Sequence, residues 1–295
     1  MHPLRAALAG VIDYAGLFPP ASLSLARVVA NHQQYFDEPR SWLLGRLILP
    51  LAALDDVESM LPQAGESTWT ISVLARSHAE VDAVASRVAA FNDRQLPAAI
   101  VAVELAADST GEIERLATAV PERYERYIEV PLHARLPELI DAVAANGCYA
   151  KVRTGGIEAR AFPESEALSR FMTVCSSRAV PFKATAGLHH PVRGSYRLTY
   201  EPQSPAALMH GFVNLVVAAG LLAFDRIDER DAAAVLETSE ASAFHMEDDR
   251  IGWGPHRLSL EECKHTRAHV LRSVGSCSFE EPIEDLERIG WLPDR

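Results

Sequence analysis

Two lysines at the ends of consecutive strand-like segments are the residues of this 295-residue chain most able to do chemistry. Lys151 lies in CYAKVRTGG and Lys183 in VPFKATAG, and each segment runs into a turn that contains glycine. Neighbouring strands lie about 5 Å apart, so the two ammonium groups would repel one another. Such repulsion lets one lysine lose its proton near neutral pH, and a neutral amine attacks a carbonyl carbon to form a Schiff base.

Two other roles for these cations remain open. Lys151, Lys183 and Arg153 can hold a phosphate or carboxylate group of a ligand, or they can form structural ion pairs. Lys151 and Arg153 share one face of their strand, as do Lys183 and Thr185, because strand side chains alternate in direction.

Three acidic residues lie in otherwise apolar strand-like segments: Asp13 in VIDYAG, Glu104 in VAVELAA and Glu129 in YIEVPL. A carboxylate in such a place transfers protons or forms a salt bridge to a buried cation. We expect Glu104 and Glu129 to take part in catalysis and Asp13 to contact the substrate. In every one of these roles they should lie beside Lys151 or Arg153.

Histidines follow the second lysine segment and raise the question of a metal. His189 or His190 could join His210, Glu104 or Glu129 around an ion. Adjacent histidines on an extended segment point in opposite directions, and no HExxH or other fixed ligand spacing occurs. We therefore assign no metal and no cofactor, and expect hydrogen bonding or proton transfer at these histidines.

The remaining candidates complete the predicted site. Cys277 has no evident base beside it in the sequence, so we predict no thiol nucleophile there. GSCSFEEP contains a capping box between Ser278 and Glu281. The residues expected to bind substrate are Asp13, Arg153, Thr154, Gly155, Thr185, His189, His190, His210 and Asn214.

Strand-like and helical patterns alternate through the first two thirds of the chain. Seven strand-helix units predict parallel pairing and an α/β fold. Seven or eight such units favour a (β/α)8 TIM-like barrel over an open doubly wound sheet, and no GxGxxG follows the first strand. The expected strands are residues 9–17, 42–49, 68–74, 99–105, 127–132, 149–153 and 180–185, and the expected helices are 22–36, 55–60, 78–91, 111–120, 136–145 and 164–178.

The rhythm changes after His190. We expect one long apolar helix over 203–224, a helix over 230–236, a hairpin or eighth strand over 243–253, a helix over 260–274 and a short closing helix. We predict a single barrel domain over residues 1–295, in which residues 203–295 either complete the barrel or form a helical and hairpin C-terminal elaboration.

Composition limits the classes of function. The formal net charge is −12, which argues against a nucleic-acid or anionic-membrane partner and favours a small-molecule substrate. Four cysteines without a CxxC pair fit a reducing compartment, so we expect a cytoplasmic protein. No signal peptide is indicated, and the longest apolar run, 211–224, is too short to span a bilayer. A homo-oligomer is compatible with this sequence.

The two lysine segments together resemble the late strands of the class I, Schiff-base aldolases of the deoxyribose-phosphate aldolase type. In that family one strand ends in Lys-x-x-Thr-Gly, which Lys151, Thr154 and Gly155 match, and the next ends in Lys-x-x-Gly-Gly, whose lysine Lys183 matches. Ala186 stands where the second motif has its first glycine. The resemblance covers about 45 residues and implies a Schiff base on Lys151 that is tuned by Lys183. FPPA, HGFVNL and GSCSFEEP have no counterpart in these aldolases and are compatible with a separate family.

The sequence therefore predicts an enzyme that acts on a small carbonyl or phosphorylated metabolite, with a lysine-dependent carbon–carbon lyase as the sharpest version. Two alternatives remain open. One is a metal- or histidine-assisted lyase or isomerase in the same barrel, and the other is a non-catalytic barrel that binds an anionic ligand.

Overall fold

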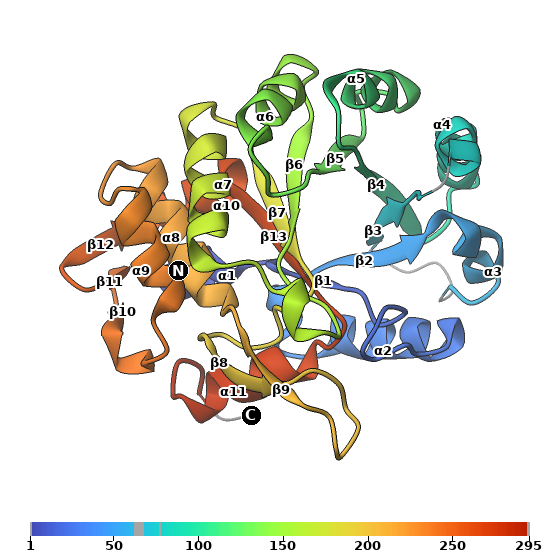
Figure 1. Ribbon diagram of the computed structural model, residues 1–295. Coiled ribbons are helices and arrows are strands. Elements are labelled where there is room, and N and C mark those ends of the chain that lie inside the picture. The colour runs from blue at the N-terminus through green and yellow to red at the C-terminus, as the bar shows by residue number, and fades with distance from the viewer. Residues whose placement is uncertain (1, 62–67, 77, 294–295) are drawn as a thin grey trace.

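Eight parallel strands close into a barrel in the computed structural model of the chain, which describes residues 2–61, 68–76 and 78–293. The strand order around the barrel is β1-β13-β7-β6-β5-β4-β3-β2, so the predicted (β/α)8 architecture is confirmed (Figure 1). The strands are β1 (Ile12–Tyr14), β2 (Leu44–Pro50), β3 (Trp69–Leu74), β4 (Ala98–Ala106), β5 (Glu125–Glu129), β6 (Tyr149–Arg153), β7 (Phe182–Thr185) and β13 (Leu271–Ser276).

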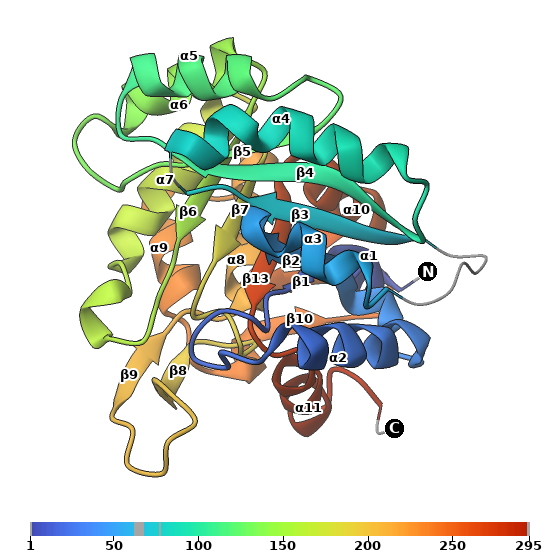
Figure 2. The ribbon, with the colours of Figure 1, turned by 90° about the vertical axis from the view of Figure 1, so that its right-hand side faces the viewer.

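Helices pack against the outside of the barrel strands, as Figure 2 shows for α4, α5 and α6. Their apolar stripes recur at helical spacing, for example Leu136, Leu139, Ile140 and Val143 on α6, all buried against the sheet. None of the described helices is long and apolar enough to cross a membrane. The helices are α1 (Pro3–Leu8), α2 (Leu25–Asp37), α3 (Leu54–Glu58), α4 (His78–Asp93), α5 (Thr110–Ala119), α6 (Leu136–Ala145), α7 (Ser165–Ser177), α8 (Phe212–Ala223), α9 (Glu229–Glu237), α10 (Leu260–His269) and α11 (Glu280–Arg288).

The last third of the chain supplies the eighth barrel strand and also several elements outside the barrel. The predicted long helix over 203–224 is wrong at its start. Residues 206–209 form β9 (Ala206–Met209), which pairs with β8 (Gly194–Arg197) in a hairpin, and α8 begins only at Phe212. Gly211 precedes that helix as its N-terminal cap. A Cβ there would collide with the backbone of Val192, so this contact explains why the chain turns at a glycine.

Of the two alternatives predicted for residues 243–253, the hairpin is confirmed and the eighth barrel strand is not. Residues 243–253 belong to a separate antiparallel sheet of β10 (Phe244–Met246), β11 (Arg250–Trp253) and β12 (His256–Ser259), which lies on the side of the barrel away from α4 and α5 (Figure 1). The predicted helix over 260–274 ends at His269, and β13 follows directly. Val270 at this junction is not helical, with φ −121° and ψ −78°.

Candidate active site

Five charged side chains meet inside the barrel, from strands that are far apart in the sequence. Lys183 Nζ donates to Asp13 Oδ2 at 2.6 Å and to Glu104 Oε1 at 2.7 Å. Lys151 Nζ lies 2.9 Å from Glu104 Oε2 and 2.9 Å from Glu129 Oε2. The two lysines occupy the same level because Lys151 pairs with Lys183 in the β6–β7 register. We call these five residues the lysine layer; Glu104 connects its two halves.

The charges of the lysine layer determine its protonation. Burial disfavours a charged Glu104, but the ammonium groups of Lys151 and Lys183 outweigh it and hold the pKa of Glu104 well below its usual range. Burial likewise lowers the pKa of Lys183, but the charges of Asp13 and Glu104 outweigh this effect and raise it. Lys183 is therefore held as an ammonium ion. The simple repulsion between two lysines that the sequence suggested is offset by three carboxylates.

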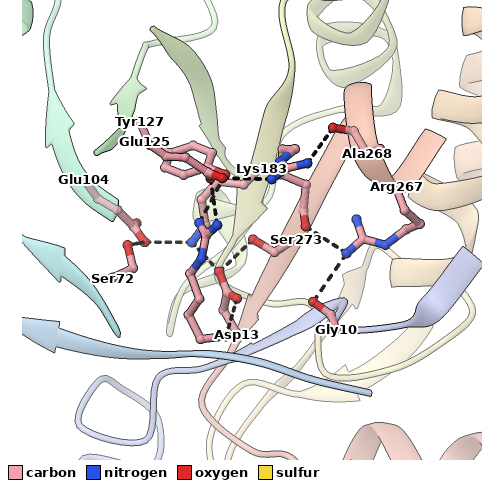
Figure 3. Close-up of polar contacts among 12 residues, drawn as sticks. Gly10, Asp13, Ser72, Glu104, Glu125, Tyr127, Lys183, Arg267, Ala268 and Ser273 are labelled. Atoms are coloured by element: carbon pink, nitrogen blue, oxygen red, sulfur yellow. Dashed lines mark hydrogen bonds and ion pairs between the residues drawn. The ribbon is translucent and has the colours of Figure 1, made fainter. Parts of the chain in front are cut away.

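Small residues make room for the lysine layer and complete its hydrogen bonds. Ser72 Oγ donates to Glu104 Oε1 at 2.8 Å, and Ser273 Oγ donates to Asp13 Oδ2 at 2.6 Å (Figure 3). The backbone N–H of Arg46 donates to Asp13 Oδ1 at 2.8 Å. A Cβ on the preceding residue, Gly45, would collide with that same oxygen, so glycine at this position allows the carboxylate of Asp13 to approach the backbone of β2.

A second charged cluster, centred on Glu125, lies beside the lysine layer in the barrel (Figure 3). Glu125 accepts hydrogen bonds from Arg46 at 2.8 Å, Tyr127 at 2.6 Å and Arg272 at 2.8 Å. Lys183 Nζ lies 5.3 Å from the centre of the Tyr127 ring, within cation–π range. These contacts fix one side of the Lys183 side chain.

A cavity of about 260 Å³ opens at the carboxyl ends of the barrel strands and reaches Lys151, Lys183 and Glu104. Its wall carries apolar side chains such as Phe18 and Ile48. Arg76 and Arg153, both exposed, also line it. A small ligand with an anionic group therefore fits this cavity by charge and size.

The residues at the carboxyl ends of β6 and β7 have distinct roles. Arg153 borders the cavity and its Nε donates to Gly155 O at 3.1 Å. Thr154 is buried, and its hydroxyl donates to Ala186 O at 2.8 Å, which ties the end of β6 to the end of β7. Gly155 allows Phe162 to pack closely, and Thr185 borders the cavity. Thr154 and Gly155 thus shape the cavity, whereas Arg153 and Thr185 face it.

His189 belongs to a polar cluster that the sequence did not reveal. The ring lies 3.9 Å from Cys277 Sγ at both nitrogens, and Nδ1 lies 3.2 Å from Ser276 Oγ and 3.4 Å from Glu281 Oε2. Tyr200 donates to Glu281 Oε2 at 2.9 Å and contacts Cys277 Sγ at 3.6 Å. The view that Cys277 has no base beside it is therefore wrong. The loop after β7 places His189 beside the end of β13, although His189 and Cys277 are 88 residues apart in the sequence.

The other predicted polar residues lie farther from the lysine layer. His190 Nδ1 lies 2.5 Å from Asp285 Oδ2, and its ring stacks on Tyr196 in a neighbouring cavity of about 310 Å³. His210 and Asn214 line neither this cavity nor the one above Lys151, and their predicted contact with substrate stays a prediction.

Both residues hold backbone segments together. His210 Nε2 lies 2.8 Å from Pro163 O, and burial lowers the pKa of its ring. Asn214 donates to Val235 O and Thr238 O. Of the two hydrogen bonds of the predicted capping box, the structure contains the one that Glu281 N donates to Ser278 Oγ, at 3.2 Å.

Within residues 2–61, 68–76 and 78–293, no three His, Cys, Asp or Glu side chains are arranged to hold a metal ion. Comparison of the chain with protein-family models, with curated proteins and with solved structures found no significant match.

Proposed function

We propose that this chain is a carbon–carbon lyase that binds the carbonyl group of a small metabolite as a Schiff base on Lys151. The observation that carries this proposal is the bridging of two barrel lysines by one carboxylate, Glu104, at the floor of a cavity. Each lysine is paired with two carboxylates, but Lys183 is fully buried, whereas the Lys151 side chain keeps 6% exposure. Both amines border the cavity, and Lys151 is the more exposed of the two.

Proton transfer from Lys151 is the first requirement of the mechanism. Glu129 lies 2.9 Å from Nζ with 26% of its side chain exposed, compared with 2% for Glu104. Glu129 therefore accepts the lysine proton and exchanges it with water, while Glu104 stays an anion between the two cations. The neutral amine adds to the carbonyl carbon, the hydroxyl group of the resulting carbinolamine takes up the proton held by Glu129, and it leaves as water to give an iminium ion.

The iminium ion then draws electrons from the adjacent carbon–carbon bond. In a β-hydroxy carbonyl compound the bond between the α and β carbons breaks, the hydroxyl proton is released and the β carbon becomes an aldehyde. The enamine left on Lys151 takes up a proton at carbon, and water releases the second product. Arg76 and Arg153 at the cavity wall favour substrates that carry a carboxylate or phosphate.

Reductive trapping tests this proposal. The purified protein is incubated with pyruvate or acetaldehyde and sodium borohydride, and its intact mass is measured. We expect a permanent single adduct that Lys151→Ala abolishes, while Lys264→Ala, at an exposed lysine on α10 paired with Glu261, keeps it. Trapping by Lys151→Ala but not by Lys183→Ala would reverse the roles of the two lysines. Trapping by both variants would refute the Schiff base in this cavity.

A further inference from the structure

A cysteine and a histidine lie side by side on the wall of the cavity that contains Lys151, and a glutamate that lines the neighbouring cavity contacts the histidine. Cys277 follows β13 directly, His189 lies in the loop after β7, and Glu281 lies in the first turn of α11. Cys277 and His189 both line the cavity of about 260 Å³. We propose that Cys277, His189 and Glu281 form a nucleophilic thiol site that adds reversibly to the carbonyl carbon of a small aldehyde.

The arrangement follows the logic of an activated nucleophile, in which a base contacts the nucleophile and a third group orients the base. His189 contacts the thiol through its ring, and its Nδ1 faces Glu281 Oε2 at 3.4 Å. Tyr200 donates to the same carboxylate oxygen and thereby positions Glu281. His189 is buried, whereas 33% of the Glu281 side chain is exposed, so solvent partly screens their interaction.

Charge in this cluster supports the same role. Burial lowers the pKa of His189, but its contacts with Cys277 and Glu281 outweigh this effect and raise the pKa to about 10. His189 therefore carries its proton at neutral pH, and an adjacent imidazolium favours the reactive thiolate form of a cysteine. The other titratable groups near the thiol are Tyr14 and Tyr200, and burial raises the pKa of each.

The chemical step balances without an oxidant or a further reactant. The Cys277 sulfur forms a bond to the aldehyde carbon, the carbonyl π bond breaks, and the oxygen takes the proton held by His189. The product is a hemithioacetal, and the reverse steps release the aldehyde. The site does not require the Schiff base on Lys151. If both nucleophiles are active, the cavity holds one carbonyl compound on each.

The other three cysteines provide an internal control for alkylation. All four cysteines are buried, but Cys277 borders the cavity, whereas burial raises the pKa of the thiols of Cys148, Cys175 and Cys263. Treatment with iodoacetamide at pH 6.5 should therefore add one carbamidomethyl group, measured by intact mass. Cys277→Ala should abolish this modification and Cys175→Ala should keep it. Modification of wild type at another cysteine, or none at all, would overturn the proposal.

His189 and Glu281 are tested by rate and by pH profile. Between pH 6 and pH 8 the alkylation rate should depend less steeply on pH in wild type than in His189→Asn, because the imidazolium beside Cys277 favours the thiolate. His189→Asn should also slow alkylation at pH 6.5 at least tenfold. Glu281→Gln, which keeps shape, should slow it less and serves as the second variant if His189→Asn does not fold. Unchanged rates in the folded variants would contradict the proposal.

Aldehyde binding is measured in the Lys151→Ala variant, so that amine capture plays no part. Glycolaldehyde at millimolar concentration should slow the alkylation of Cys277 at least fivefold, and dilution should restore the rate. An alkylation rate that glycolaldehyde leaves unchanged would refute aldehyde addition at this thiol. Because the variant lacks Lys151, this experiment tests only the thiol site. The Schiff base is tested separately by borohydride trapping, so failure of one proposal can be told from failure of the other.

Discussion

Replacing Glu104 by glutamine removes the charge shared by the two lysines while keeping the shape of the side chain. Oε1 accepts hydrogen bonds from Lys183 and Ser72, and Oε2 faces Lys151. In Glu104→Gln one position becomes an amide N–H₂ group that points at an ammonium donor. Lys151 and Lys183 each keep one carboxylate, Glu129 and Asp13 respectively.

Burial sets the size of the expected effect. Breaking a buried ion pair by removing one partner lowers the free energy of unfolding by about 3–5 kcal/mol. Because Lys151 keeps Glu129 and Lys183 keeps Asp13, we expect the loss in Glu104→Gln to lie near the lower end of this range. Glu129→Gln is the matched control, because Glu129 contacts the same Lys151 nitrogen at the same distance of 2.9 Å. Its side chain is 26% exposed, so its loss should cost about 1 kcal/mol or less.

Urea unfolding at pH 7, followed by circular dichroism, gives the free energy of unfolding of each variant. Because the pKa of Glu104 is held below its usual range, the difference between wild type and Glu104→Gln should be present above about pH 5 and shrink as the pH falls. Equal losses of less than 1 kcal/mol in both variants would show that the lysine layer is no buried ion network, and the reasoning would be refuted.

Two further predictions concern electrostatics in and around the barrel. Lys183→Met removes a cation that shares Glu104 with Lys151. Two cations about 6 Å apart repel one another by roughly 3 kcal/mol at an effective dielectric constant near 20. The pH midpoint of borohydride trapping should therefore rise by about one to two pH units, and a fall would contradict the pairing. His32 packs against Trp69 with its ring buried, and burial lowers its pKa to about 4. Between pH 6.5 and pH 4 the unfolded chain binds this proton and the folded chain does not, so stability falls with falling pH by up to about 3 kcal/mol. His32→Phe should remove that part of the pH dependence in urea titrations, and an unchanged slope would exclude it.

The sequence predicts the barrel elements well where apolar residues recur with a clear strand or helix period. The bounds of β6 and α6 agree residue for residue with the expected 149–153 and 136–145. The strand β13 escapes prediction because LRSVGS lacks a clean apolar alternation. Its small residues face the interior, where Ser273 meets Asp13 and Gly275 lies against Thr185. The tertiary neighbours of this strand, rather than its own propensity, make it a strand.

The candidate site is likewise predictable from the sequence only in part. Charged residues within apolar strands reveal the lysine layer, since a buried charge needs a partner. The sequence cannot show that Glu104 serves both lysines, because that depends on the register of four strands. The thiol cluster is also hidden, since His189 and Cys277 are separated by 88 positions. The one local signal is the polar GSCSFEEP segment, which a β-strand and a helix place at the carboxyl end of the barrel.

The position of β13 between β1 and β7 has a consequence for how the protein is made. During synthesis on the ribosome, the seven other barrel strands emerge before β13. The 85 residues between the end of β7 at Thr185 and the start of β13 at Leu271 also emerge first. Until β13 arrives, β1 and β7 are open edges, ready to pair with other chains, and Asp13 lacks the hydroxyl group of Ser273. We expect biogenesis to depend on protection of that gap during synthesis, and the candidate active site to form only when β13 closes the barrel.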